Sequence, residues 1–175
     1  MSKKIRWICR NAIGTALFVA LSMCLQVPVF ENFYVCLGYV VMTVYLYLFG
    51  SVSGTIVGVL GTAIYCFLIN GLRGMPGWLL ANVVIGVIVG VTLQLCKQKV
   101  FKRPLAKWCT VIIITILAVA LGIFGVKSLT ECFLYAQPML VRMATNAPAF
   151  ITDVIVILFS IPLCEMLYRN KEDKG

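Results

Sequence analysis

Histidine is absent from this 175-residue chain, and only 12% of its residues are charged. The lack of histidine removes the most frequent general base and the most frequent neutral metal ligand. A soluble domain is usually about one quarter charged. With 62% apolar residues, this chain has too few charges to cover a water-facing surface. The composition excludes a soluble enzyme and a disordered chain, and it favours a protein embedded in a bilayer.

Long uncharged runs divide the chain into membrane passes. No charged residue occurs between Glu31 and Arg73, a gap of 41 positions. A helix crosses a bilayer with about 20 residues, so this gap holds two passes, with a turn predicted in 49–54, where glycine and serine cluster. The predicted helices are 12–30, 35–49, 53–70, 78–96, 108–127 and 149–168. No A-x-A-like cleavage site follows the first, so we expect it to be retained. The sequence predicts one all-α integral membrane domain over 1–175, a compact six-transmembrane-helix bundle.

The basic residues orient this bundle. The chain has 15 Lys and Arg residues, and with six passes all but Arg73, Lys127 and Arg142 fall on one side. By the positive-inside rule, both termini and the loop between the fourth and fifth helices are cytoplasmic. The net charge of +9 is then a topology signal with some contact to anionic membrane lipid. No basic stripe with interleaved aromatic residues indicates nucleic-acid binding.

The eight cysteines are scattered along the chain, and none forms C-x-x-C. Without histidine partners they do not indicate a metal site or a redox site, and we expect no metal and no cofactor. Most are expected to be small packing residues. Cys36 and Cys132 both fall on the expected outer side, and the sequence leaves their pairing open.

Small residues recur at helical spacing in three of the predicted helices. Such spacing lets helix backbones approach closely in lipid. For the glycines we expect helix packing, and for the alanines either packing or contact with a second membrane protein. The glycines are Gly54, Gly58, Gly61, Gly86 and Gly90, and the alanines are Ala12, Ala16 and Ala20.

The outer loops, 26–34, 70–78 and about 127–148, carry most of the non-basic polar side chains. A pocket for a water-soluble molecule is therefore predicted at the outer mouth. An ionisable residue inside a span indicates function, so Asp153 is a candidate with Arg73 or Arg142 as its partner, or else an interfacial acid at a helix N-terminus. Asn82 is a ligand contact or an interhelical hydrogen bond, and the aromatic residues are ligand contacts or interface anchors. The predicted substrate-binding residues are Glu31, Tyr39, Arg73, Trp78, Asn82, Arg142, Asn146 and Asp153.

Several motifs together carry a family resemblance. Leu37-Gly38-Tyr39 precedes Leu48-Phe49-Gly50-Ser51, and the glycines at 54, 58 and 61 follow. This order resembles the S components of energy-coupling factor (ECF) vitamin transporters over nearly the whole chain. Tyr39 stands where that family frequently has an acid and Ser51 where it has proline, so no role is carried over for that acid. Ala16 to Ala20 is similar to the family's A-x-x-x-A motif, which implies a surface for the transmembrane T protein.

The resemblance implies a binding subunit of the bacterial cell membrane. Such a subunit captures a vitamin or related micronutrient outside the cell and delivers it through a T protein and two cytosolic ATPases. The chain has no phosphate-binding loop of its own, and we expect no enzyme activity. The alternatives are a stand-alone carrier or structural subunit, and a lipid-modifying membrane enzyme. The vitamin is not identified by the sequence.

Overall fold

The computed structural model describes residues 2–24, 28–30, 33–34, 36–69, 75–97 and 104–172. Nearly all of these residues are helical, as the apolar runs predict, and two short antiparallel strands follow the first helix. The elements are α1 (Lys3–Cys24), β1 (Pro28–Phe30), β2 (Phe33–Tyr34), α2 (Gly38–Phe49), α3 (Ser51–Ile69), α4 (Met75–Lys97), α5 (Pro104–Ala120), the π-helix η1 (Leu121–Lys127), α6 (Ser128–Tyr135) and α7 (Met139–Glu172).

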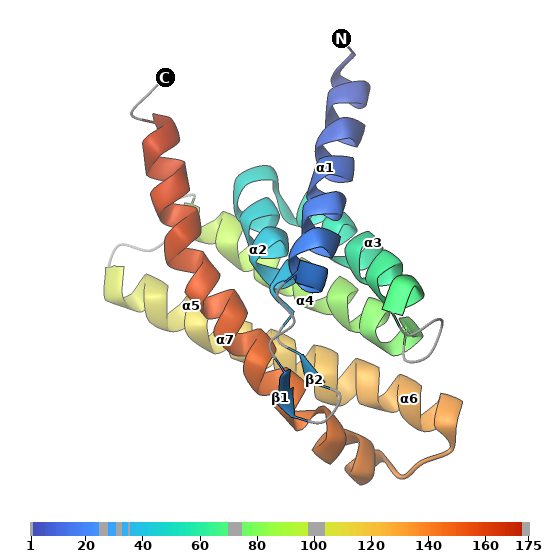
Figure 1. Cartoon of the computed structure of the whole chain (residues 1–175). Helices are drawn as coiled ribbons and strands as arrows, with labels where there is room; N and C mark the ends of the chain where they lie inside the picture. The colour runs from blue at the N-terminus through green and yellow to red at the C-terminus, as the bar shows by residue number, and fades with distance from the viewer. Residues whose placement is uncertain are drawn as a thin grey trace.

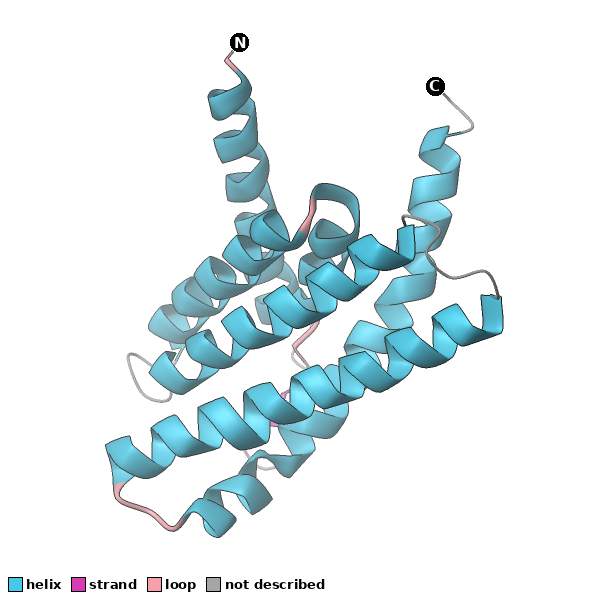
Figure 2. Ribbon diagram, turned by 180° about the vertical axis from the view of Figure 1, so that it is seen from behind, coloured by secondary structure: helices cyan, strands magenta, loops and turns pink. Residues whose placement is uncertain are grey.

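Five helical stretches are long and apolar enough to cross a membrane. Four are α1, α3, α4 and α7, and the fifth is the run of α5, η1 and α6, which forms one continuous rod (Figure 2). The sixth helix, α2, has only 12 residues. The all-helical membrane fold predicted from composition is confirmed.

The helix bounds differ from the predicted ones at several ends. The first helix covers 3–24 rather than 12–30. The predicted loop over 127–148 is largely helical, because the fifth pass continues to Tyr135 and α7 begins at Met139. Ala136, which has a left-handed backbone with φ 50°, ends α6. Backbone groups at membrane depth need internal hydrogen bonds, so helix continues through residues that would signal a loop in water.

The short helix α2 lies at the centre of the bundle, in contact with α1, α3, α4 and α7. Glycines on the neighbouring helices make this packing close. A Cβ on Gly54 would lie 2.5 Å from the Leu46 side chain, and a Cβ on Gly90 would lie 2.8 Å from the same side chain. The remaining predicted packing glycines, Gly58, Gly61 and Gly86, also face neighbouring helices at distances that leave no room for a side chain.

A turn at Gly50 joins α2 to α3, inside the predicted segment 49–54. Its φ of 103° lies in a region that glycine adopts without steric cost.

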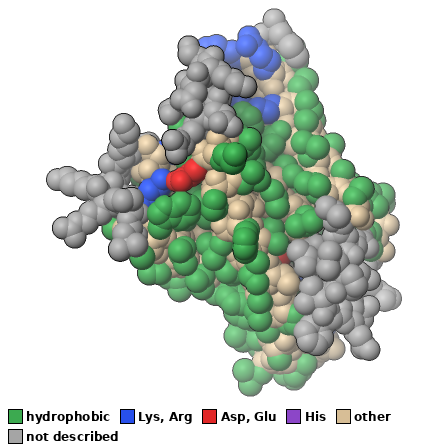
Figure 3. All heavy atoms as spheres, turned by 60° about the vertical axis from the view of Figure 1, so that its left-hand side comes forward, with side chains coloured by type: hydrophobic (Ala, Val, Ile, Leu, Met, Phe, Trp, Pro, Cys, Tyr) green, Lys and Arg blue, Asp and Glu red, His purple; other side chains and the backbone are tan. Residues whose placement is uncertain are grey.

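The two chain ends lie at the same end of the molecule (Figure 1). The basic positions of α1, the end of α4 and the start of α5 share that end, which we call the terminal end. On the face shown in Figure 3, hydrophobic side chains cover most of the surface, and Lys and Arg side chains gather toward its upper part. We call the opposite end of the bundle the distal end. The start of α2, the start of α4 and the first half of α7 lie there.

Candidate substrate-binding site

A chain of hydrogen bonds links three helices near the distal end. The indole Nε1 of Trp78 donates to the Tyr39 hydroxyl at 2.9 Å, and that hydroxyl donates to Oδ1 of Asn82 at 2.7 Å. Nδ2 of Asn82 donates to Oγ1 of Thr62 at 2.6 Å. We call Tyr39, Thr62, Trp78 and Asn82 the Tyr39 cluster. Tyr39, Thr62 and Asn82 have 0% exposure, so a polar network at this depth persists because its members satisfy one another.

The carboxylate of Asp153 adjoins the Tyr39 cluster from α7. Asp153 is 4% exposed, and its side chain lies beside the Tyr39 hydroxyl. The positive charge of Lys127 acts on it from η1, and the Lys127 ammonium also lies 5.8 Å from the ring centroid of Trp78. A buried carboxylate requires such compensation. The structure therefore brings an acid from α7, a base from η1, and an amide and an indole from α4 together.

The π-helix η1 places Lys127 at this position. The backbone N–H of Ser128 reaches the carbonyls of both Ile123 and Gly125. Gly122 allows η1 to approach α4, because a Cβ there would lie 2.8 Å from Ile85. π-turns within α-helices are frequent at functional sites. In the sequence, this turn is marked by Gly122 and Gly125. Glycines at this spacing also occur in ordinary helix packing, so they do not identify a π-turn.

A second polar cluster joins α6 to α7. Nδ2 of Asn146 donates to Oε2 of Glu131 at 2.9 Å and to Oγ of Ser128 at 3.1 Å. The Arg142 guanidinium lies 3.9 Å from the same Glu131 oxygen and 4.6 Å from the Tyr135 ring centroid. We call Ser128, Glu131, Arg142 and Asn146 the Glu131 cluster. Ser128 directly follows Lys127, whose ammonium lies 5.8 Å from the Trp78 ring centroid, so this cluster adjoins the Tyr39 cluster.

Five of the eight predicted binding residues belong to these clusters, and Asp153 adjoins the first. Arg73 and Glu31 lie outside the described residues. The structure pairs Arg142 with Glu131, whereas the predicted partner was Asp153, which instead has Lys127 nearby. Thr62, Lys127, Ser128 and Glu131 were not among the predicted binding residues, because their proximity depends on helix packing.

The two outer cysteines do not form a disulfide bond in the structure. Cys36 is buried and Cys132 partly buried, and both thiols are free. The Cys36 thiol instead lies 3.4 Å from the Ser22 hydroxyl. The bridge that the sequence left open is therefore absent.

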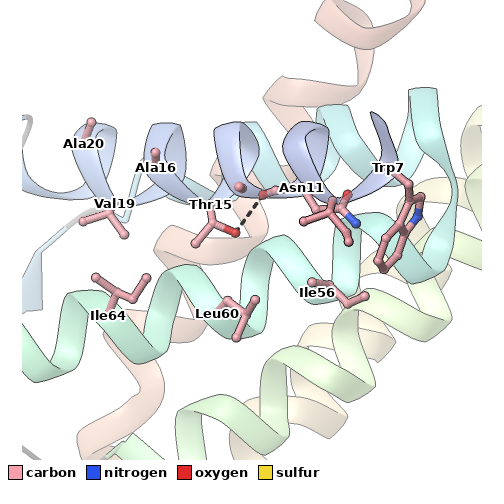
Figure 4. Close-up of a pocket in the computed structure, with 11 residues that line it drawn as sticks. Trp7, Asn11, Thr15, Ala16, Val19, Ala20, Ile56, Leu60 and Ile64 are labelled. Carbon is pink, nitrogen blue, oxygen red and sulfur yellow. Dashed lines mark hydrogen bonds between the residues drawn. The ribbon is translucent and has the colours of Figure 1, made fainter. Parts of the chain in front are cut away.

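The alanines at positions 12, 16 and 20 are exposed along α1. They line a groove of about 690 Å³ between α1 and α3 (Figure 4). This groove is separate from both polar clusters.

The helical fold and its enclosed polar clusters define the class as a small multi-pass membrane protein. The family model described as "ECF-type riboflavin transporter, S component" matches residues 2–169 of this chain. The chain belongs to this family of ECF transporter S components, which confirms the resemblance seen in the sequence.

Individual relatives agree with this assignment. A UPF0397 protein of Streptococcus thermophilus, known from two strains, is 29% identical over 90 residues, which are 51% of this chain and 49% of the relative. The chain thus spans about half the length of the curated relatives it matches. The solved S component for biotin from an ECF-type ABC transporter has a TM-score of 0.64 and 20% identity, and the match covers 97% of this chain and 95% of that chain. The two share the fold.

Proposed function

We propose that this chain is the substrate-binding subunit of an ECF-type importer and that it captures a vitamin-like molecule at the distal end. The observation that carries the proposal is the pair of adjoining polar clusters, buried in an otherwise apolar bundle. Polar groups at membrane depth are expensive, and these converge from α2, α3, α4, η1, α6 and α7. Ligand pockets combine such placed polar groups with apolar and aromatic surface.

The charges at this site favour a ligand without net charge. Arg142 lies beside Glu131, and Lys127 lies near Asp153, so each cation has an anion close by. The aromatic side chains Trp78 and Tyr65, whose rings meet edge to face at 6.0 Å, offer surface for a ring system. Riboflavin, which the family description names, is an uncharged ring system and is the first ligand to test.

The buried members of the site act by holding the partly exposed ones. Tyr39, held by Asn82, fixes the indole of Trp78. Glu131, held by Asn146, lies beside Arg142. In the proposed bound state, Trp78 supplies contact area, and Asn82, Asn146 and Asp153 orient the ligand through hydrogen bonds. Tyr39, Arg142, Arg73 and Glu31 complete the set of proposed contacts. Exclusion of water by the ligand strengthens each polar contact.

Delivery into the cell requires partners in this proposal. The small-residue face of α1, with Ala12, Ala16 and Ala20, offers a smooth surface for a transmembrane T protein, which couples to two ATPase subunits. The terminal end carries most of the basic residues and is placed in the cytoplasm. The distal end, with its polar clusters, then faces the outside.

A fluorescence titration tests the binding proposal. Purified protein is titrated with riboflavin and, in parallel, with biotin, while flavin or tryptophan fluorescence is followed. Trp78→Leu is expected to weaken binding at least tenfold, because it removes the ring surface and the hydrogen bond to Tyr39. Trp108→Leu on α5 is the matched control and should retain wild-type affinity.

If no vitamin binds the purified protein and mass spectrometry finds none co-purifying from cells grown in rich medium, the chain is not a substrate-binding subunit. If a vitamin binds equally well to both tryptophan variants, the binding site is not at the Tyr39 cluster.

A further inference from the structure

The groove between α1 and α3 has an apolar interior that faces the bilayer. On α1, Thr15 and Val19 point toward Leu60 and Ile64 on α3 across the groove (Figure 4). Ala16 and Ala20 also line it, on the outer side of α1. Its volume of about 690 Å³ exceeds that of a few side chains. An apolar hollow on a membrane-facing surface is filled by hydrocarbon of some kind.

A second hollow, of about 430 Å³, adjoins this groove at the terminal end. Lys3, Arg6, Trp7 and Arg10 line it, and their spacing of three and four places them on one face of α1. Trp7 lines both hollows, so the two adjoin at this residue. α1 contains no acidic residue, and the first acid of the chain is Glu31. We call this hollow the basic cup.

A buried amide without a partner lies where the groove meets the basic cup. Asn11 is 5% exposed and lines the groove. Neither its Nδ2 nor its Oδ1 has a hydrogen-bond partner within the part of the chain that the structure describes. Nε of the adjacent Arg10 is likewise unpartnered there. Buried polar atoms are almost always paired in folded proteins, so these point to a ligand that supplies polar atoms at this depth.

We propose that the groove and the adjoining basic cup together bind one anionic phospholipid. The order of chemistry along α1 matches the order of parts in such a lipid. The phosphate lies in the basic cup, an ester carbonyl of the glycerol accepts a hydrogen bond from Nδ2 of Asn11, and an acyl chain follows the apolar groove past Ala16 to Ala20. From Asn11 to Ala20 the helix rises about 14 Å, close to the thickness of one hydrocarbon leaflet of roughly 15 Å.

This lipid site goes beyond the proposed function and does not depend on it. It uses the same surface as the proposed docking of the T protein, so the lipid must leave when that partner arrives. Lipid binding to the isolated subunit is therefore measured without partner and without vitamin. A failure of the lipid proposal leaves vitamin capture at the distal end untouched.

Native mass spectrometry of the purified protein in detergent, with added lipid, tests the proposal. Dioleoyl phosphatidylglycerol is expected to bind as one saturable copy and at least tenfold more tightly than dioleoyl phosphatidylcholine. The double variant Lys3→Gln, Arg6→Gln should weaken phosphatidylglycerol binding about 25-fold, since each cation near an anionic surface contributes about a fivefold factor. Lys4→Gln is the matched control, because Lys4 is on the same turn but does not line the basic cup.

Asn11 provides a separate readout for the ester contact. An ether-linked phosphatidylglycerol lacks the ester carbonyl, so the wild type should prefer the ester lipid, and Asn11→Leu should bind the two equally. Equal binding of phosphatidylglycerol and phosphatidylcholine overturns the proposal and leaves the groove to a protein helix. Equal losses in the Lys4 variant and the double variant also overturn it, because the attraction is then diffuse. Binding of glycerol phosphate as tight as that of the whole lipid overturns it in favour of a soluble anion.

Discussion

Replacement of Tyr39 by phenylalanine tests whether the buried network organises the distal site. The hydroxyl of Tyr39 accepts from Trp78 at 2.9 Å and donates to Asn82 at 2.7 Å. Tyr39→Phe removes both bonds without changing the ring, which packs edge to face against Phe18 at 6.3 Å. An interhelical hydrogen bond in a membrane protein contributes on average about 0.6 kcal/mol and at most about 1.7 kcal/mol. Loss of both should lower the free energy of unfolding by about 1–3 kcal/mol.

Tyr39→Phe should also weaken ligand binding. Without the hydroxyl, the indole of Trp78 and the amide of Asn82 lose the group that fixes their orientation. Ligand affinity should fall about tenfold or more, equivalent to at least about 1.4 kcal/mol. Unfolding in detergent followed by circular dichroism measures the stability, and fluorescence titration measures the affinity.

Tyr45→Phe is a matched control on the same helix. The Tyr45 hydroxyl donates to the backbone carbonyl of Arg10 at 2.9 Å, toward the terminal end and away from the site. This variant should lose at most about 1 kcal/mol of stability and should keep wild-type affinity. If Tyr39→Phe and Tyr45→Phe reduce affinity equally, or if neither does, the Tyr39 cluster does not organise the ligand site.

Three further predictions concern packing, assembly and orientation. Gly54→Ala should destabilise the bundle by about 1–3 kcal/mol in detergent unfolding, because the new Cβ would lie 2.6 Å from the α2 backbone. Gly125→Ala is the control and should not destabilise it, since the nearest contact of its Cβ is at 3.7 Å. Equal effects of the two variants would contradict close packing at Gly54. Ala16→Trp should leave vitamin affinity unchanged but abolish co-purification with the T protein and ATPases, and a variant that loses both functions would show that the alanine face stabilises the fold instead. In single-cysteine variants, an impermeant maleimide should label the exposed Cys24 on intact cells and the exposed Cys9 only after permeabilisation; the reverse pattern would invert the proposed topology.

Composition and charge alone predicted the fold class. The scarcity of charge leaves no surface suited to water, so helices in a bilayer are the physical solution, and backbone hydrogen bonding within each helix is local. The small-residue spacing predicted which helix faces approach closely, since that spacing follows directly from helical periodicity. The same local reasoning failed over 127–148, where glycine, lysine and proline suggest a loop in water but are accommodated within helix in this fold.

Tertiary structure decided which polar residues lie together at the candidate site. Tyr39 meets Asn82 across 43 positions of sequence, and no periodicity encodes that distance. The π-turn that carries Lys127 toward Trp78, and the choice of Glu131 as the partner of Arg142, also follow from how the rod of α5 to α6 packs on α4 and α7. The sequence by itself determined that polar groups gather at one end, because their positions along each span are local properties. Only the packing of the helices determined which of them touch, because a hydrogen bond depends on side-chain placement to within a few tenths of an ångström.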